Sequence, residues 1–183
     1  MTEPLFDLAG IILSLLIYLV LTRVLLQLCR ADRYNPLAMG IARFTDTFLA
    51  PLRRVLPSVA RWDLAGVLVL IVLGLLSTVI TNRFGLMGFV APPVWILSLI
   101  ELLSTIMDMY KVFIILIVVA SFVAQGSYHP ALELLRQLTE PLLSPVRRRL
   151  PAVGGLDFSP LIVLTALWMA QKYVLPALIQ LLL

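Results

Sequence analysis

Two short arginine-rich segments contain the residues best able to do chemistry. Each segment begins and ends with proline, as PLRRVLP in the first half of the chain and PVRRRLP in the second. Guanidinium groups bind carboxylates and phosphates through paired hydrogen bonds, so these segments could hold anionic lipid headgroups or an acidic partner protein. The candidate binding residues are Arg53, Arg54, Arg147, Arg148 and Arg149.

Cys29 and His129 are the single cysteine and the single histidine of the chain. One chain therefore cannot form an internal disulfide or a zinc site built from cysteine and histidine ligands. His129 precedes Pro130, a position typical of a helix cap, and as a haem ligand it would offer only one axial position. Neither residue fits the pattern of a nucleophile with a base. We expect no catalytic residue, no metal and no cofactor.

The composition indicates a membrane protein. Of the 183 residues, 61% are hydrophobic and 13% are charged, and the mean hydropathy is +1.05. Soluble domains carry about twice this share of charge. A span needs about 20 mostly apolar residues, and four stretches qualify: residues 5–28, 64–80, 105–124 and 161–183. The first contains Glu3 and Asp7 near its start rather than Lys or Arg, which argues against a cleaved signal peptide.

Basic residues are concentrated in two loops. Residues 29–63 and 125–157 hold ten of the fourteen lysines and arginines. Short loops rich in Lys and Arg stay in the cytoplasm, so we expect both loops on the cytoplasmic side of the inner membrane and both termini on the opposite face. Residues 83–104 must then begin and end outside. We expect an interfacial or re-entrant segment broken at Pro92-Pro93, with a long tilted helix over residues 94–124 as the alternative.

The chain contains an internal repeat with a register of 94 residues. Eleven residues between positions 34 and 63 are identical to the residue 94 positions later, and they lie in a polar loop where shared hydrophobicity cannot explain the agreement. Each unit is a span, a loop and a span in the same orientation, which predicts two halves related by an axis along the membrane normal. We predict an all-α membrane protein with four transmembrane helices in two parallel repeats, residues 1–82 and 105–183, joined by an apolar connector over residues 83–104.

Each loop is predicted to contain an amphipathic helix. Proline suits the first position of a helix, where its missing N–H is not needed, so Asn35-Pro36 and His129-Pro130 are typical helix starts. Such a helix lies in the plane of the interface. The prolines that follow predict an extended segment, in which each arginine adds about 1 kcal/mol of attraction to anionic lipid. The predicted apolar stripes are Leu37, Ile41, Phe44 and Phe48, and Ala131, Leu135, Leu138 and Leu142.

Charged residues also occur at the ends of the spans and inside them. Asp63 and Asp157 open the second and fourth spans at equivalent positions, and we expect them to cap these helices and to pair with nearby arginines rather than to form an ion site. Asp108 and Lys111 are three residues apart and can pair. Lys172 lies within the fourth span and is expected to snorkel outward or to pair with Glu101 or Asp108.

The repeat resembles the YggT family of small integral membrane proteins, whose relatives in chloroplasts and cyanobacteria are called YlmG. Residues 138–160, LTEPLLSPVRRRLPAVGGLDFSP, follow the family signature of a Pro-x-Arg-Arg core, a proline near a glycine pair, and Asp-x-Ser-Pro leading into a span. The first copy departs from it, with Thr47 in place of Pro141 and Ala65-Gly66 in place of Ser159-Pro160. The resemblance implies an accessory membrane protein without shared catalytic chemistry, linked in different lineages to nucleoid distribution and division, osmotic tolerance and maturation of a b-type cytochrome.

These observations favour a scaffold or assembly factor that binds anionic lipid and a membrane or cytoplasmic partner protein through its arginine-rich loops. A transporter or channel for small solutes or ions is the alternative. Direct nucleic-acid binding is disfavoured because the arginines are tied to the headgroup plane and form no extended basic stripe. The pairs Gly74 with Thr78 and Ala166 with Ala170 allow close helix contact; we expect internal packing, and homo-oligomerisation remains open.

Overall fold

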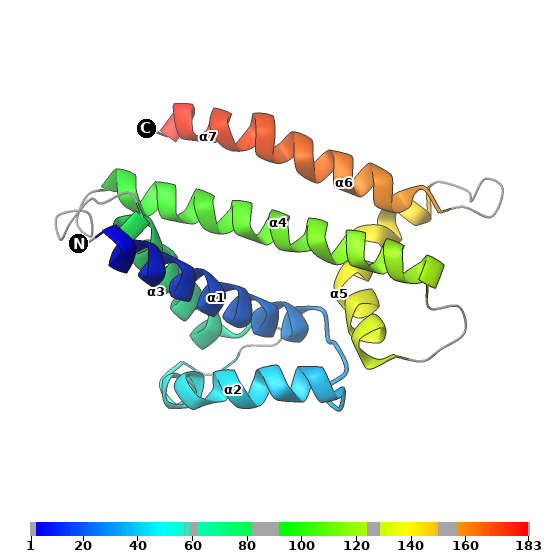
Figure 1. The fold of residues 1–183 in the computed structure, drawn as a ribbon, viewed down its shortest axis with the longest axis horizontal. Coiled ribbons are helices and arrows are strands. Elements are labelled where there is room, and N and C mark those ends of the chain that lie inside the picture. The colour runs from blue at the N-terminus through cyan, green and yellow to red at the C-terminus, as the bar shows by residue number, and fades with distance from the viewer. Residues whose placement is uncertain are drawn as a thin grey trace.

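The structure is a computed structural model that describes residues 3–56, 58, 62–81, 92–123, 129–149 and 157–182. These residues form an all-α protein (Figure 1). The predicted fold class is confirmed, because four helices are long and apolar enough to cross a membrane: Pro4–Leu28, Leu64–Thr81, Pro93–Ser121 and Ser159–Leu182. The elements are α1 (Glu3–Leu28), α2 (Pro36–Arg53), α3 (Leu64–Thr81), α4 (Pro92–Val123), α5 (Pro130–Arg147), α6 (Ser159–Met169), the π-helical turn η2 (Ala170–Val174) and α7 (Leu175–Leu182).

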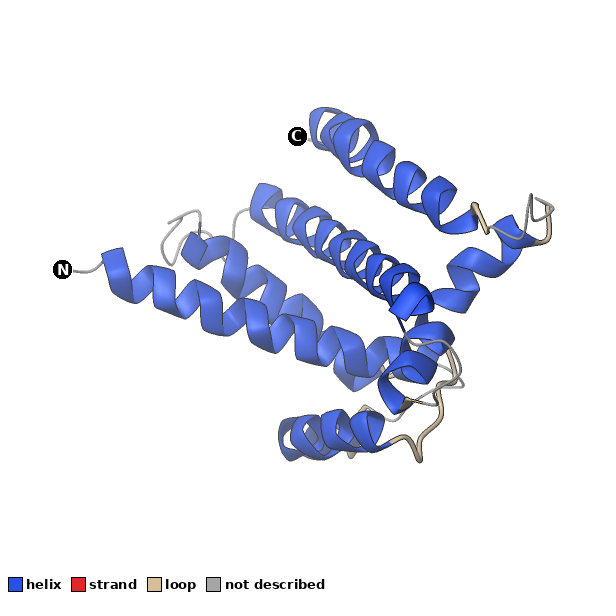
Figure 2. Ribbon diagram, turned by 45° about the vertical axis from the view of Figure 1, so that its right-hand side comes forward, coloured by secondary structure: helices blue, strands red, loops and turns tan. Residues whose placement is uncertain are grey.

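The four long helices pack in a definite order. The helix α3 contacts both α1 and α4, and α6 to α7 contacts α4. Figures 1 and 2 show α6 to α7 running along α4 on the side away from α1, with both chain termini at the same end of the spans. The largest buried cluster joins α1, α3, α4 and both loop helices, and includes Leu21, Leu70, Met109 and Leu138.

Only part of the predicted connector, residues 83–104, lies outside the helices. Residues 92–104 belong to α4, which is one continuous helix of 32 residues, so the expectation of an interfacial or re-entrant segment was wrong there and the long-helix alternative is correct. Pro92 and Pro93 do not break the helix because they occupy its first turn, where no backbone N–H is needed. At 1.5 Å per residue the helix is about 48 Å long, more than the roughly 30 Å hydrocarbon core. Residues 83–91 lie outside the described residues.

The two loop helices begin as predicted. Asn35 and His129 are the N-caps, and their side chains accept hydrogen bonds from the N–H groups of Leu37 and Ala131. The prediction of extended arginine segments was wrong, because α2 continues to Arg53 and α5 continues to Arg147.

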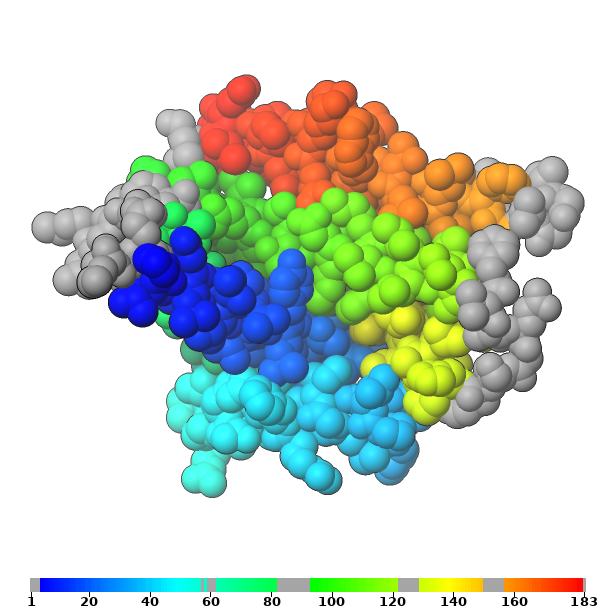
Figure 3. Space-filling view, viewed as in Figure 1, coloured from blue at the N-terminus to red at the C-terminus, as the bar shows by residue number. Residues whose placement is uncertain are grey.

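The predicted apolar stripe of α2 is divided between the bundle and the surface, because Ile41 and Phe48 pack against the core. Leu37 and Phe44 are exposed, whereas the residues buried against the bundle are Ala38, Thr45 and Leu49. Figure 3 shows α2 at the lower edge of the molecule, next to α1.

The fourth span contains an irregular turn just before Pro176. The turn η2 lies just before α7, and Pro176 follows it. Proline lacks an N–H and its ring collides with the carbonyl four residues earlier, which is Lys172 here. The wider π turn relieves that collision, so the helix continues through η2 into α7.

Candidate arginine–carboxylate site

Arg53 joins α2 to α3 through two carboxylates. Its Nη1 donates to Asp46 Oδ1 at 2.5 Å, its Nε donates to Asp63 Oδ1 at 3.3 Å, and its Nη2 donates to Asp63 Oδ2. Asp46 lies seven residues before Arg53, two helical turns away on the same side of α2. This spacing requires a helical backbone through Pro51, which explains why the segment is not extended.

Asp63 is deeply placed beside two helices. Its side chain has no exposed surface, and its Oδ1 accepts a hydrogen bond from Gly66 N–H at 3.2 Å. A Cβ at Gly66 would lie 2.7 Å from Val24 Cγ2 and 3.0 Å from Asp63 Oδ2, so only glycine permits this approach of α3 to α1. Arg23 of α1 lies 3.7 Å from Asp46. Four charged residues therefore link α1, α2 and α3.

The pKa of Asp63 reflects this environment. Burial acts to raise the pKa, but hydrogen bonds from Arg53 and Gly66 N–H, together with the positive charges of Arg53 and Arg23, lower it below its usual range. The carboxylate thus stays ionised at neutral pH despite having no contact with solvent. The buried charge is compensated by bidentate pairing, the geometry that guanidinium groups favour.

The second half repeats the arrangement at positions 94 residues later. Arg147 Nε donates to Asp157 Oδ2 at 2.9 Å, and its Nη1 donates to Glu140 Oε2 at 3.1 Å. We call Arg53 and Arg147, each with its two carboxylates, the two arginine clamps. The sequence analysis suggested pairing of the aspartates with arginine but missed Asp46 and Glu140. Their equivalent positions and common charge were the signal that could have found them.

The two arginine clamps differ in depth. The side chains of Arg147 and Asp157 are 45% and 40% exposed, against 21% and 0% for Arg53 and Asp63. Position 117, equivalent to Arg23, is isoleucine. Because Pro160 stands in place of Gly66 and has no N–H, Asp157 accepts from Ser159 N–H instead, at 2.9 Å. Burial tends to raise the pKa of Asp157, but hydrogen bonds from Ser159 and Arg147 lower it overall.

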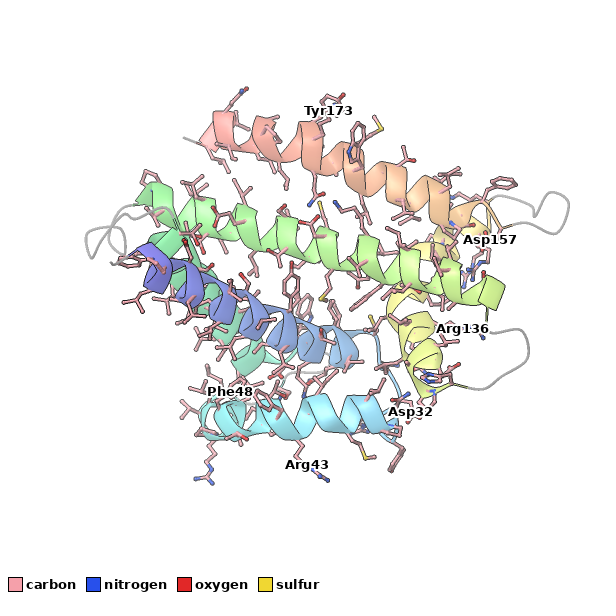
Figure 4. All side chains as sticks on the ribbon, in the orientation of Figure 1. Asp32, Arg43, Phe48, Arg136, Asp157 and Tyr173 are labelled. Carbon is pink, nitrogen blue, oxygen red and sulfur yellow. The ribbon has the colours of Figure 1, made fainter. Side chains whose placement is uncertain are left out.

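The other candidate arginines lie differently. Arg54, Arg148 and Arg149 are exposed, and no carboxylate among the described residues pairs with them. They directly follow α2 and α5, whose C-terminal carbonyl groups favour positive charge. Each loop therefore has one arginine bound internally and at least one directed to the surface. Figure 4 shows that Arg43, on α2, also projects away from the spans.

The two loops meet at one end of the bundle. Asp32 N–H donates to Gln137 Oε1 at 2.7 Å, and Asn35 Nδ2 donates to the carbonyl of Pro130 at 2.7 Å. Figure 4 shows Asp32 beside the start of α5. Cys29 lies at the same junction, with its Sγ 3.9 Å from the Leu138 carbonyl, and burial raises the pKa of its thiol.

Polar residues inside the spans form a second group, between α4 and η2. The predicted Asp108–Lys111 ion pair is present at 2.7 Å, and Lys111 Nζ also donates to Gln171 Oε1. Gln171 Nε2 in turn donates to Ser104 Oγ at 2.9 Å. This link from α4 to the fourth span was not anticipated, because nothing in the local sequence of Gln171 indicates its distant partner.

Lys172 does not pair with Glu101 or Asp108, so the pairing alternative was wrong, and its exposed side chain agrees with the outward alternative. Its Nζ lies 4.6 Å from the centre of the Trp168 ring and 5.5 Å from that of Tyr173. Glu101 instead accepts a hydrogen bond from Thr78 Oγ1 at 2.5 Å. Lys172 therefore lies on the outer side of the fourth span, while its neighbour Gln171 points towards α4.

A small cavity lies between α1, α3 and α4. Its volume is about 80 Å³, and its lining includes the polar side chains of Ser14, Ser77, Ser98, Glu101 and Thr105. A larger opening of about 440 Å³ lies towards the N-terminal end of α1 and shares Ser14 with it. These two hollows could accommodate water or a small polar solute.

Comparison with known proteins shows the family. A family model described as CCB3/YggT matches residues 2–84 and 96–178, two segments displaced by the 94 residues of the internal repeat. A Pseudomonas aeruginosa protein titled uncharacterized protein PA0392 is 39% identical over 88% of this chain and 83% of its own length. The Escherichia coli K12 protein titled uncharacterized protein YggT is 35% identical, over 86% and 81%. No solved structure matches. The chain is a member of the CCB3/YggT family.

Proposed function

We propose that this protein is a non-enzymatic scaffold or assembly factor of the bacterial inner membrane, which holds anionic lipid headgroups and a partner protein at its arginine-rich loops. The observation that carries the proposal is that some arginines of the loops are ion-paired within the protein and others are exposed. Arg53 and Arg147 hold the loops in shape through the arginine clamps. Arg54, Arg148 and Arg149 are left exposed for an external anion.

The placement of α2 supports a position at headgroup depth. Leu37 and Phe44 are 47% and 60% exposed, although the neighbouring Ala38 and Thr45 are buried against the spans. An exposed phenylalanine and leucine on a helix that also carries Arg43 are typical of an amphipathic helix with one side in the acyl boundary. On this proposal α2 anchors Arg43 and Arg54 at the depth of lipid phosphates.

The orientation follows from the positive-inside rule. Both loops lie at one end of the bundle and contact each other through Asp32 and Asn35, which supports placing both on the same membrane face. We assign this face to the cytoplasm and the termini to the opposite side. Cysteines introduced at Ser58 and at Leu182, in a Cys29→Ala background, test the assignment with an impermeant maleimide on intact spheroplasts. Labelling at position 58 but not at 182 would contradict it.

The lipid part of the proposal is tested by neutralising the exposed arginines together. We expect the triple variant Arg54→Gln, Arg148→Gln, Arg149→Gln to co-purify with less phosphatidylglycerol and cardiolipin than the wild type, because each basic residue near the surface contributes about 1 kcal/mol. The matched Lys triple variant keeps the charge and should retain the lipid. Equal anionic lipid in the Gln and wild-type proteins, measured by lipid mass spectrometry, would refute this part.

The partner part needs a separate measurement in native membranes. A photo-crosslinking amino acid at position 54 or 148 should give one discrete protein adduct, and the same probe at Leu15, which is exposed within α1, should not give that adduct. Adducts with lipid alone at positions 54 and 148 would leave the lipid role and overturn the scaffold role.

A second candidate function is transport or conduction of a small solute or ion, and the cavity between α1, α3 and α4 favours it. Ionisable residues within spans commonly mark ion pathways, and Glu101 lines this cavity. Flux of K⁺, H⁺ or a small osmolyte into liposomes containing the protein, lost on Glu101→Gln substitution, would support transport over scaffolding. Absence of flux above empty liposomes would dismiss it.

A further inference from the structure

The contact between α3 and α4 is the junction of the two repeats within one chain. Thr78 is fully buried there, and its hydroxyl donates to Glu101 at 2.5 Å. Leu75, Val79 and Val94 form a small buried cluster in the same contact. The junction thus joins the second span of one repeat to the first span of the next, through a polar bond set among apolar side chains.

The positions equivalent to this junction are exposed on the two outer helices of the chain. The residues equivalent to Leu75, Thr78 and Val79, 94 positions later in the chain, are Met169, Lys172 and Tyr173. All three are exposed on the fourth span. In the same register, the residue equivalent to Glu101 in the first repeat is Asp7, which is exposed on α1. The residues beside Asp7 are also large, apolar and exposed: Leu5, Phe6, Leu8 and Ile11.

The two outer surfaces carry opposite charges at equivalent heights. Lys172 contacts only the rings of Trp168 and Tyr173 among the interactions described, and Asp7 has no ion pair among the described residues. Repeats related by an axis along the membrane normal keep the depth of equivalent residues, so Lys172 and Asp7 lie at the levels of Thr78 and Glu101. Asp7 lines the larger opening between α1 and the end of α3. An ionised side chain within a span is costly unless it is paired.

We propose that a second copy of this chain packs its α1 against α6 to α7 as α4 packs against α3, and that Lys172 pairs with Asp7 of the second copy. Lipid tails could cover the apolar side chains of both surfaces, but they would leave both charges unpaired. A two-fold axis normal to the membrane forms this contact twice, so the dimer is closed and leaves neither surface free. In Figure 3 the fourth span forms the upper edge of the molecule and α1 faces the viewer.

Charge reversal in lipid bilayers tests the contact. The full-length protein, labelled at Ser58→Cys in a Cys29→Ala background, should show energy transfer between donor and acceptor copies that falls with dilution in lipid. Lys172→Glu and Asp7→Lys should each weaken dimerisation by about tenfold or more, and the double variant Asp7→Lys with Lys172→Glu should restore it. Arg43→Glu, the same charge change on α2, should have no effect.

Two results would overturn the proposal. One is a wild-type protein that stays monomeric at every protein-to-lipid ratio, and the other is a double variant that dimerises no better than the single ones. Both charged residues are exposed, and near-UV circular dichroism checks that each variant keeps its fold.

Disulfide trapping provides a second measurement of the same arrangement. A mixture of Leu8→Cys and Tyr173→Cys proteins, each lacking Cys29, should form a crosslinked heterodimer on mild oxidation. Crosslinked homodimers of either single variant in place of the heterodimer would show a different interface and refute the proposed packing.

Discussion

Arg53 and Asp63 form a two-point ion pair across the connection from α2 to α3, and the carboxylate of Asp63 has no exposed surface. The equivalent pair of Arg147 with Asp157 is joined by one hydrogen bond, from Arg147 Nε to Asp157 Oδ2 at 2.9 Å, and both side chains remain substantially exposed. One chain therefore contains the same ion pair in a buried form and in a solvated form. Comparing the two pairs therefore measures how much burial of the ion pair contributes to the free energy of unfolding.

The first prediction concerns the stability of the two arginine clamps. We expect Asp63→Asn to lower the free energy of unfolding by about 3–5 kcal/mol, because it leaves Arg53 without its buried partner. Asp157→Asn should cost about 1 kcal/mol or less, as exposed ion pairs do. Thermal unfolding of both variants in the same detergent gives the comparison, and equal losses would show that burial does not distinguish the pairs.

The second prediction concerns pH. The folded-state pKa of Asp63 and of Asp157 is lowered, so their stabilisation is complete above the unfolded pKa of about 3.9 and is lost as pH falls through the folded value. We expect the melting temperature to drop as pH falls below about 4. The drop should be smaller in Asp63→Asn than in the wild type, and identical pH profiles for the two proteins would contradict the assignment.

The third prediction compares two glycines. Gly66→Ala should destabilise the protein by about 1–3 kcal/mol, because the new Cβ would lie 2.7 Å from Val24 Cγ2. Gly40 lies within α2 with nothing within 4 Å of its Cβ position, so Gly40→Ala should stabilise the helix by about 0.5–1 kcal/mol. Chemical denaturation of both variants in detergent micelles checks the opposite signs.

The fourth prediction concerns the starts of the loop helices. Asn35 caps α2 and also donates to the carbonyl of Pro130 on the other loop, whereas His129 makes the cap bond of α5 alone among the contacts described. Asn35→Ala should cost about 1–2 kcal/mol and His129→Ala about 0.5–1 kcal/mol. If the two losses, measured by thermal unfolding, prove equal, the bond between the loops contributes nothing.

Local sequence patterns predict much of the architecture. The lengths of the apolar stretches, the Asn-Pro and His-Pro helix starts and the 94-residue register were sufficient to predict the four spans, the two loop helices and the repeat. The matched segments of the family model carry the same register. These features depend on residues close together in the chain or on self-similarity, and neither requires knowledge of how helices pack.

Tertiary structure decided which charged residue meets which. The patterns treated Arg53, Arg54 and Arg147 to Arg149 as equals, but only the first of each group lies within reach of two carboxylates. They also could not distinguish Gln171, which bonds to α4, from Lys172, which faces outward. Periodicity reports which residues share one side of a helix. The side that meets a neighbour depends on the relative rotation of helices distant in sequence, which is set by the packing of all of them together.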